Sequence, residues 1–264
     1  MDRVMRAAIL IVGSLFWDEV DVRQEWRDRR LLLGEAVPVT VPIYYGRQAS
    51  TRGNTYTMAF DRRRRRRGRA LLVPCSTPVG GVEDLQAEAR ELWAAERRKR
   101  ELGGIGADWG CVGVAFHGRR AAALADGWRG FFRNNVTEPV WPVTEDGVLG
   151  IAWPRGAGST RADFILTTAT APRGVGGVGA VAHAWVEQDA GEEKYFFNNV
   201  EHGIRTPDDR AIWRAMERGR TAWRAEEKYP RAVEILRGET VPRRRVPAAP
   251  GEGALCGGPA RPEG

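Results

Sequence analysis

The stretch that decides the fold lies near the start of the chain and reads Ala7-Ala8-Ile9-Leu10-Ile11-Val12-Gly13-Ser14-Leu15-Phe16. Its continuous apolar run predicts a buried strand, and the Gly-Ser pair predicts a turn directly after it. Where a strand breaks into such a turn, backbone N–H groups become available to an anionic oxygen, and glycine lets a ligand come close. A purely structural turn would give the same pattern. The segment lacks the spacing of a P-loop or of GxGxxG, so it does not indicate a nucleotide site.

Three further strands are expected in the first half, at residues 37–45, 54–60 and 70–74, on their apolar and β-branched residues. Six consecutive arginines, beginning at Arg62 and ending at Arg67, separate the last two. Like charges resist regular structure, so we expect a hairpin with the arginines at its solvated tip. The run supplies most of the formal net charge of +7, which would be +1 without it. Because the excess charge is local, a nucleic-acid partner is not favoured.

The most specific candidate for chemistry lies on a helix expected at residues 82–100. The helix has an apolar stripe at helical spacing, formed by Val82, Leu85, Ala89, Leu92 and Trp93. Continued at the same spacing, the stripe reaches Glu96, which therefore shares the core-facing side. A carboxylate drawn toward a core is disfavoured as the anion, and this suits a general acid–base group. Alternatively, Glu96 reaches solvent or pairs with Arg97 or Arg100.

A second group of candidates is Ser50, Arg52 and Asn54, which occupy alternate positions just before the strand at residues 54–60. If that strand begins early, the three side chains point to one side. Arg52 could then hold a carboxylate with two parallel hydrogen bonds. A surface loop is the alternative reading.

The second half of the chain gives fewer signals. Strands are expected at residues 148–153, 164–169 and 180–186, and a helix from Thr206-Pro207-Asp208-Asp209 to about residue 228, followed by another to residue 236. The polar segment at residues 198–203 is the best candidate here for a site loop. Gly, Pro, Ala and Arg dominate from residue 238, so we expect a disordered tail over 238–264.

Several classes of protein are not indicated. The three histidines are scattered and the three cysteines form no CxxC pair, so we expect no metal site. No apolar stretch approaches the roughly 20 residues of a membrane span. The apolar run after the charged first residues is too short for the core of a signal peptide. We therefore expect a cytoplasmic protein with no membrane partner.

In this order the elements resemble the γ-glutamylcyclotransferase-like family. Members open with a strand and a Tyr-Gly-Ser-Leu-type loop, which Ile11-Val12-Gly13-Ser14-Leu15 matches. They continue to a helix with a Leu-Asp-x-x-Glu motif, which Leu92-Trp93-Ala94-Ala95-Glu96 matches. The resemblance covers about residues 7–116. Val12 stands where the family has tyrosine and Trp93 where it has aspartate.

The resemblance implies an α+β fold in which a mixed sheet curls into a small barrel flanked by helices, with extra C-terminal helices. We expect one domain over residues 1–237, with an enlarged second half at about 117–237. The implied activity is release of 5-oxoproline from a γ-glutamyl amine or peptide, and it requires no metal and no other cofactor. Glu96 would be the acid–base group, and the N–H groups of Gly13, Ser14 and Leu15 would bind a carboxylate or carbonyl of the small-molecule substrate.

Arg52 and Asn54 are further candidate substrate contacts. Two alternatives to this activity stay open. A non-catalytic small-molecule-binding protein of the same fold is the first alternative, because Val12 and Trp93 are apolar where the family is polar. Nucleic-acid binding through the arginines from Arg62 to Arg67 is the second.

Overall fold

The structure is a computed structural model, and it describes residues 4–63, 67–174, 176–186, 194–218 and 222–238. Its centre is the predicted first strand, β1 (Met5–Ile11), whose side chains are buried at every position except Arg6. β1 pairs antiparallel with one neighbour and parallel with the other, so the sheet is mixed. The six strands have the order β2-β5-β1-β8-β7-β6. Their bounds are β2 (Val37–Val41), β5 (Gly68–Val79), β8 (Phe164–Thr170), β7 (Gly110–Phe116) and β6 (Gly106–Ala107).

The strands on either side of the arginine run do not form the expected hairpin. β4 (Thr55–Phe60) pairs with β3 (Ile43–Ala49) in a separate two-stranded ribbon, whereas β5 pairs with β1 and β2. The arginines therefore connect two sheets, and Arg62, Arg63 and Arg67 are exposed there. β5 is an apolar strand long enough to cover two neighbours, and the core contacts of β1 hold it in the larger sheet.

One helix, α2 (Val82–Arg97), packs against β5, β7 and β8. Four of the five predicted stripe residues, Leu85, Ala89, Leu92 and Trp93, are buried, whereas Val82 in the first turn is half-buried. Helices α1 (Asp21–Arg30) and α4 (Ala125–Asn135) in turn pack against α2, and the short α3 (Gly118–Ala122) precedes α4. Four short 3-10 helices complete this half: η1 (Ser14–Phe16), η2 (Leu33–Glu35), η3 (Ser50–Arg52) and η4 (Ala157–Thr160).

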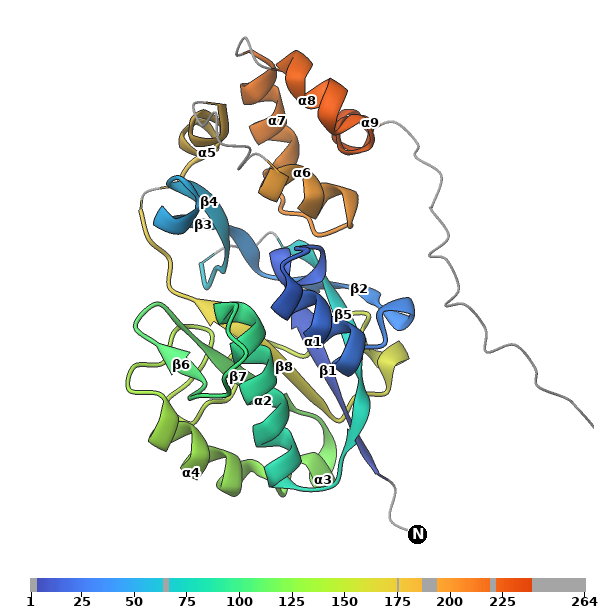
Figure 1. Cartoon of the computed structure of the whole chain (residues 1–264), viewed down its shortest axis with the longest axis vertical. Helices are drawn as coiled ribbons and strands as arrows, with labels where there is room; N and C mark the ends of the chain where they lie inside the picture. Colours follow the sequence, from blue (N-terminus) through green and yellow to red (C-terminus); the bar gives the residue numbers. More distant parts are fainter. Residues whose placement is uncertain (1–3, 64–66, 175, 187–193, 219–221, 239–264) are drawn as a thin grey trace, which may run out of the picture.

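The described part of the second half ends in helices that lie beyond the β3–β4 ribbon, at the opposite end from the large sheet (Figure 1). They are α5 (Val178–Val186), α6 (Lys194–Glu201), α7 (Asp209–Glu217), α8 (Ala222–Lys228) and α9 (Pro230–Arg237). α5 packs on β4, and α6 packs on η1 directly after β1. The ribbon thus lies between the sheet and the helices.

Three expectations for the second half were wrong. Residues 180–186 are helical, because Val181, Ala182 and Trp185 are buried at the spacing of a helix face. Residues 148–153 form no strand and make only isolated bridges. The helix expected up to residue 228 is two helices, α7 and α8. The predicted tail lies outside the described residues from 239 onward.

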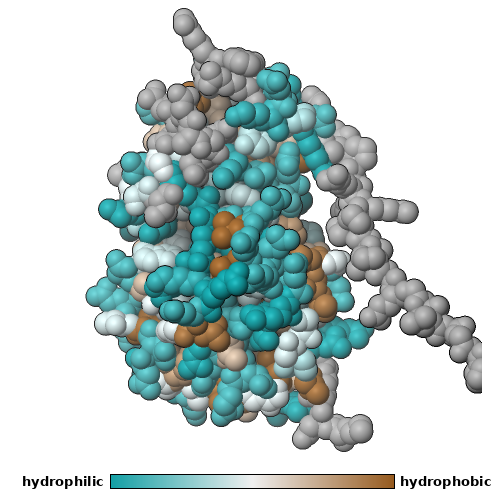
Figure 2. Space-filling model, in the orientation of Figure 1, coloured by the Kyte–Doolittle hydropathy of each residue, from teal (hydrophilic) through white to brown (hydrophobic). Residues whose placement is uncertain are grey.

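The α+β class with a mixed sheet is confirmed. The face of the molecule in Figure 2 is mostly hydrophilic, with smaller hydrophobic areas between. None of the helices in the described part of the chain combines the length and apolar composition that a membrane crossing requires.

Candidate active site

A cavity of about 550 Å³ lies where the end of β1, the ribbon β3–β4, the end of α2 and helix α6 meet. Its lining includes six of the seven candidate residues from the first half of the sequence, namely Gly13, Ser14, Leu15, Ser50, Arg52 and Glu96. The seventh, Asn54, does not line it. Residues from two distant motifs are thereby brought into one pocket.

Gly13 is required by a close contact and not by its backbone angles. Its φ of −171° is extended backbone, which any residue adopts. A Cβ at this position would lie 2.5 Å from Oη of Tyr195, which is far inside contact distance. The Tyr195 hydroxyl accepts a hydrogen bond from the Met58 N–H at 3.1 Å, and burial raises the pKa of the phenol. The Gly-Ser turn therefore makes room for a neutral tyrosine that α6 supplies.

Arg23 on α1 joins the Gly-Ser turn to the end of α2, and its side chain is only 4% exposed. It donates to Oγ of Ser14 at 2.7 Å and to the carbonyl oxygens of Ala95 and Glu96, both at 3.1 Å. The last carbonyls of a helix lack partners within the helix, so the guanidinium also completes the end of α2. Burial lowers the pKa of Arg23, with Glu96 and Asp18 acting in the opposite direction.

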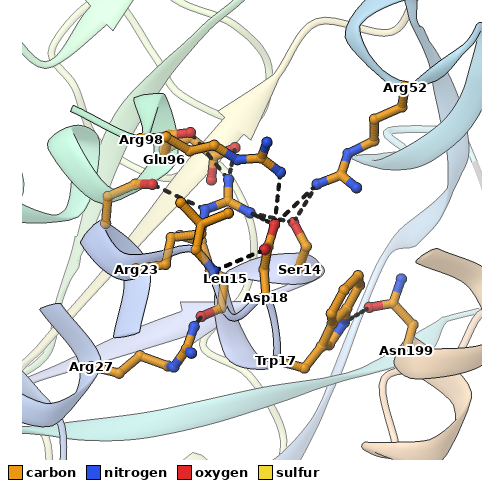
Figure 3. A network of polar contacts seen from close by, with 12 residues as sticks. Ser14, Leu15, Trp17, Asp18, Arg23, Arg27, Arg52, Glu96, Arg98 and Asn199 are labelled. Atoms are coloured by element: carbon orange, nitrogen blue, oxygen red, sulfur yellow. Dashed lines mark hydrogen bonds and ion pairs between the residues drawn. The ribbon is translucent and has the colours of Figure 1, made fainter. Parts of the chain in front are cut away.

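Asp18 is the carboxylate on which three arginines converge (Figure 3). Its Oδ2 lies 2.8 Å from Arg23, 2.7 Å from Arg98 and 3.4 Å from Arg52. Burial by itself raises the pKa of Asp18, but the three guanidinium groups and the Val20 N–H bring it below its usual value. One carboxylate faces three cations, so this end of the site keeps an excess of positive charge.

Glu96 lies in the last turn of α2 with its side chain 19% exposed. Its Oε2 accepts from Oγ1 of Thr168 on β8 at 3.3 Å, and its Oε1 lies 3.7 Å from Nη2 of Arg23. The carboxylate is therefore oriented by two elements and still reaches the cavity. The alternative pairing with Arg97 or Arg100 is not what the structure shows.

Arg52 reaches the site from the tip of the ribbon. It belongs to η3, and its guanidinium donates to Oγ of Ser14 at 3.2 Å and lies 5.1 Å from the ring centre of Tyr195. The expected early start of the strand was wrong, because Gly53 and Asn54 both have positive φ and form a turn. Asn54 is exposed in that turn, which explains its absence from the lining.

The lining is dominated by arginine. Six arginines, Arg23, Arg47, Arg52, Arg97, Arg98 and Arg173, face two acids, Glu96 and Asp108. Six contributors were not predicted from the sequence, namely Asp18, Arg23, Arg47, Arg98, Arg173 and Tyr195. Asp18, four residues after Ser14, lies nearest in the sequence to a predicted motif.

The polar segment at residues 198–203 is not a site loop. Its first half belongs to α6, where Asn199 is fully buried and accepts from Nε1 of Trp17 at 2.7 Å (Figure 3). The same helix carries Tyr195 into the cavity. The second half thus contributes to the cavity through Tyr195 on α6 and through Thr168, Thr170 and Arg173, which lie on or shortly after β8.

Within the described residues, no cluster of three or more His, Cys, Asp or Glu has an arrangement that could hold a metal ion. Cys75 and Cys111 are buried free thiols outside the cavity lining. The chemistry available in the cavity is therefore anion binding by arginine and by Ser14, together with proton transfer at Glu96.

Comparison of the chain with protein-family models, with curated proteins and with solved structures gives no match in any of the three.

Proposed function

We propose that the chain is a γ-glutamylcyclotransferase-like enzyme that acts on a γ-glutamyl amine or peptide and releases 5-oxoproline. The observation that carries the proposal is that Glu96 and the turn Gly13-Ser14-Leu15 line one cavity, although they are far apart in the sequence. These are the two motifs on which the resemblance rests. Their shared cavity is what a common catalytic role requires.

Ser14 is suited to bind an oxygen of the substrate. Its hydroxyl accepts hydrogen bonds from Arg23 and Arg52, which occupies both acceptor positions of the oxygen. No described residue accepts the proton of this hydroxyl, so the proton remains for a ligand oxygen. Ser14 and Leu15 also begin η1, where backbone N–H groups have no partner within the helix. The α-carboxylate of a γ-glutamyl group is the proposed occupant, beside the positive charge of Arg52 and Arg98.

The reaction needs one acid–base group. The α-amine nitrogen attacks the γ-carbonyl carbon and forms the C–N bond of a five-membered ring, while the bond from that carbon to the leaving nitrogen breaks. Glu96 takes a proton from the α-amine and passes one to the leaving amine. The products are 5-oxoproline and the free amine, and no water is consumed. Both reacting groups belong to one molecule, so the enzyme has mainly to hold it in the folded conformation.

A small barrel is the fold that the resemblance implies. The described strands of the large sheet and of the β3–β4 ribbon both border the cavity. We include closure of these strands into a barrel, and a cytoplasmic location, among the proposed properties.

A non-catalytic binding protein of the same fold is the second candidate. The six arginines in the lining favour it, because such a lining suits retention of an anion whether or not a reaction follows. This candidate predicts that the ligand binds and is released unchanged.

The test is release of 5-oxoproline from a panel of γ-glutamyl amines and peptides, with Glu96→Gln as the variant. We expect a loss of roughly 10²- to 10⁴-fold in kcat, the usual contribution of a general acid–base group. Glu91→Gln is the matched control, because Glu91 lies on the same helix and pairs with the exposed Arg29 away from the cavity. Turnover in Glu96→Gln equal to that of the unchanged chain would refute the assignment, and binding without turnover would favour the second candidate.

A further inference from the structure

We propose that Arg47 and Arg173 form a second anion site in the same cavity, which binds a carboxylate carried by the leaving amine. The preferred substrate is then a γ-glutamyl amino acid or peptide, and a γ-glutamyl alkylamine is a poor one. This inference rests on the proposed function and adds a specificity determinant to it.

The two arginines lie side by side because of backbone pairing. Arg47 on β3 and Arg173 after β8 form a parallel bridge, with Gln48 N–H donating to the Arg173 carbonyl at 2.8 Å and Arg173 N–H donating to the Gly46 carbonyl at 2.9 Å. Bridge partners direct their side chains to the same face. Both side chains line the cavity.

The Arg47 guanidinium is held in place before any ligand binds. Its Nη1 donates to the Ala171 carbonyl at 2.9 Å, and the group lies 5.6 Å from the ring centre of Trp109. Trp109 is stacked on Trp93, with ring centres 4.8 Å apart and planes 24° from parallel. Trp93 is the residue that replaces the aspartate of the family motif, and it is fully buried. The departure from the motif therefore builds the support on which Arg47 rests.

The charge of this pair is only partly compensated by the protein, because Asp108 and Glu96 are the only acids that line the cavity with it in the described part of the chain. Arg173 is exposed, and no described side chain or backbone group forms a hydrogen bond or ion pair with its guanidinium. Burial lowers the pKa of Arg47 and the neighbouring Arg173 lowers it further, while Asp108 and Glu96 oppose them. Like charges placed opposite each other are destabilising, and an anion between them removes the repulsion.

The position suits the leaving group of the proposed reaction. In a γ-glutamyl amino acid, the second carboxylate carbon is two bonds from the nitrogen that Glu96 protonates. The cation that binds it must therefore lie in the same cavity as Glu96, as Arg47 and Arg173 do. The first carboxylate is meanwhile held at Ser14. Two carboxylates on one substrate also account for the arginine excess in the lining.

The experiment compares γ-glutamyl-alanine with γ-glutamyl-ethylamine, which differ by one carboxylate. We expect kcat/KM for γ-glutamyl-alanine to be about 10 to 100 times that for γ-glutamyl-ethylamine, which is the usual effect of a charge-assisted hydrogen bond. The double variant Arg47→Met/Arg173→Met should lose about that factor on γ-glutamyl-alanine and stay within about twofold on γ-glutamyl-ethylamine. Arg214→Met, at an exposed position on α7, is the control and should change neither value.

Equal kcat/KM for the two substrates, or an equal loss on both in the double variant, would overturn the inference while leaving the proposed function intact. If neither compound yields 5-oxoproline, the proposed function fails, and calorimetric titration of the unchanged chain with the same two compounds decides about the anion site. The site predicts that γ-glutamyl-alanine binds at least roughly tenfold more tightly and that the double variant abolishes the difference. Equal binding, or binding of neither compound, refutes it.

Discussion

Replacement of Arg23 by methionine tests the claim that this buried arginine holds the two halves of the site together. The side chain donates to Ser14 and to Asp18, and it also binds the carbonyl oxygens of Ala95 and Glu96. Methionine has a similar length and fills the space, but it makes none of these bonds. The variant therefore removes the polar contacts with little change in packing volume.

The expected loss follows from the surroundings of the group. Removing one partner of a buried ion pair lowers the free energy of unfolding by about 3–5 kcal/mol. Asp18 keeps Arg98 and Arg52 after the change, so we expect the lower part of that range, about 3 kcal/mol. For a chain of this size, 1 kcal/mol moves Tm by roughly 2–4 °C, so Tm should fall by about 6–12 °C.

Urea denaturation followed by tryptophan fluorescence measures this loss. Arg29→Met is the matched control on the same helix, because the Arg29 side chain is 63% exposed and its ion pair with Glu91 is worth under about 1 kcal/mol. A loss in Arg23→Met no larger than in the control would show that the network around Arg23 does not stabilise the site.

Two further predictions concern single contacts. Gly13→Ala should lower the free energy of unfolding by about 1–3 kcal/mol, because the added Cβ would meet Oη of Tyr195. Adding Tyr195→Phe should restore part of that loss, because it removes the hydroxyl. If the losses of the two single variants simply add in the double variant, as measured by denaturation, the two side chains do not clash. Burial raises the pKa of Glu88 from 4.5 to about 7 despite its ion pair with Arg30, so the folded state holds this proton more tightly than the unfolded state. Stability from this group is present below pH 4.5 and lost as pH rises through 7, by about 3 kcal/mol in all. Glu88→Gln should flatten that part of the pH–stability curve, and an unchanged slope would show that Glu88 is not its cause.

The parts of the fold that follow from local pattern could be predicted from the sequence. A continuous apolar run gave β1, and helical spacing gave the buried face of α2. Extending that spacing by one turn reached Glu96, which the structure places at the cavity. Each of these depends on residues within a few positions of one another.

Pairing and burial over long distances could not be predicted in this way. β4 pairs with β3 and is covered by α5, which lies far along the chain. The charged run directly after β4 therefore gave no information about which strand β4 pairs with. Arg23 lies in a mostly charged helix, where nothing in the spacing distinguishes a buried arginine from exposed ones. Tyr195 reaches Gly13 and Met58 from α6, far along the chain. By contrast, Gly53-Asn54 did carry a turn signal against an early start of β4.

Identifying the products formed from γ-glutamyl-alanine tests the proposed reaction itself. We expect 5-oxoproline and alanine in equal amounts, with no free glutamate, because the α-amine of the substrate and not water attacks the γ-carbonyl. Release of glutamate, or recovery of unchanged substrate after it has bound, would refute the proposed cyclotransferase reaction.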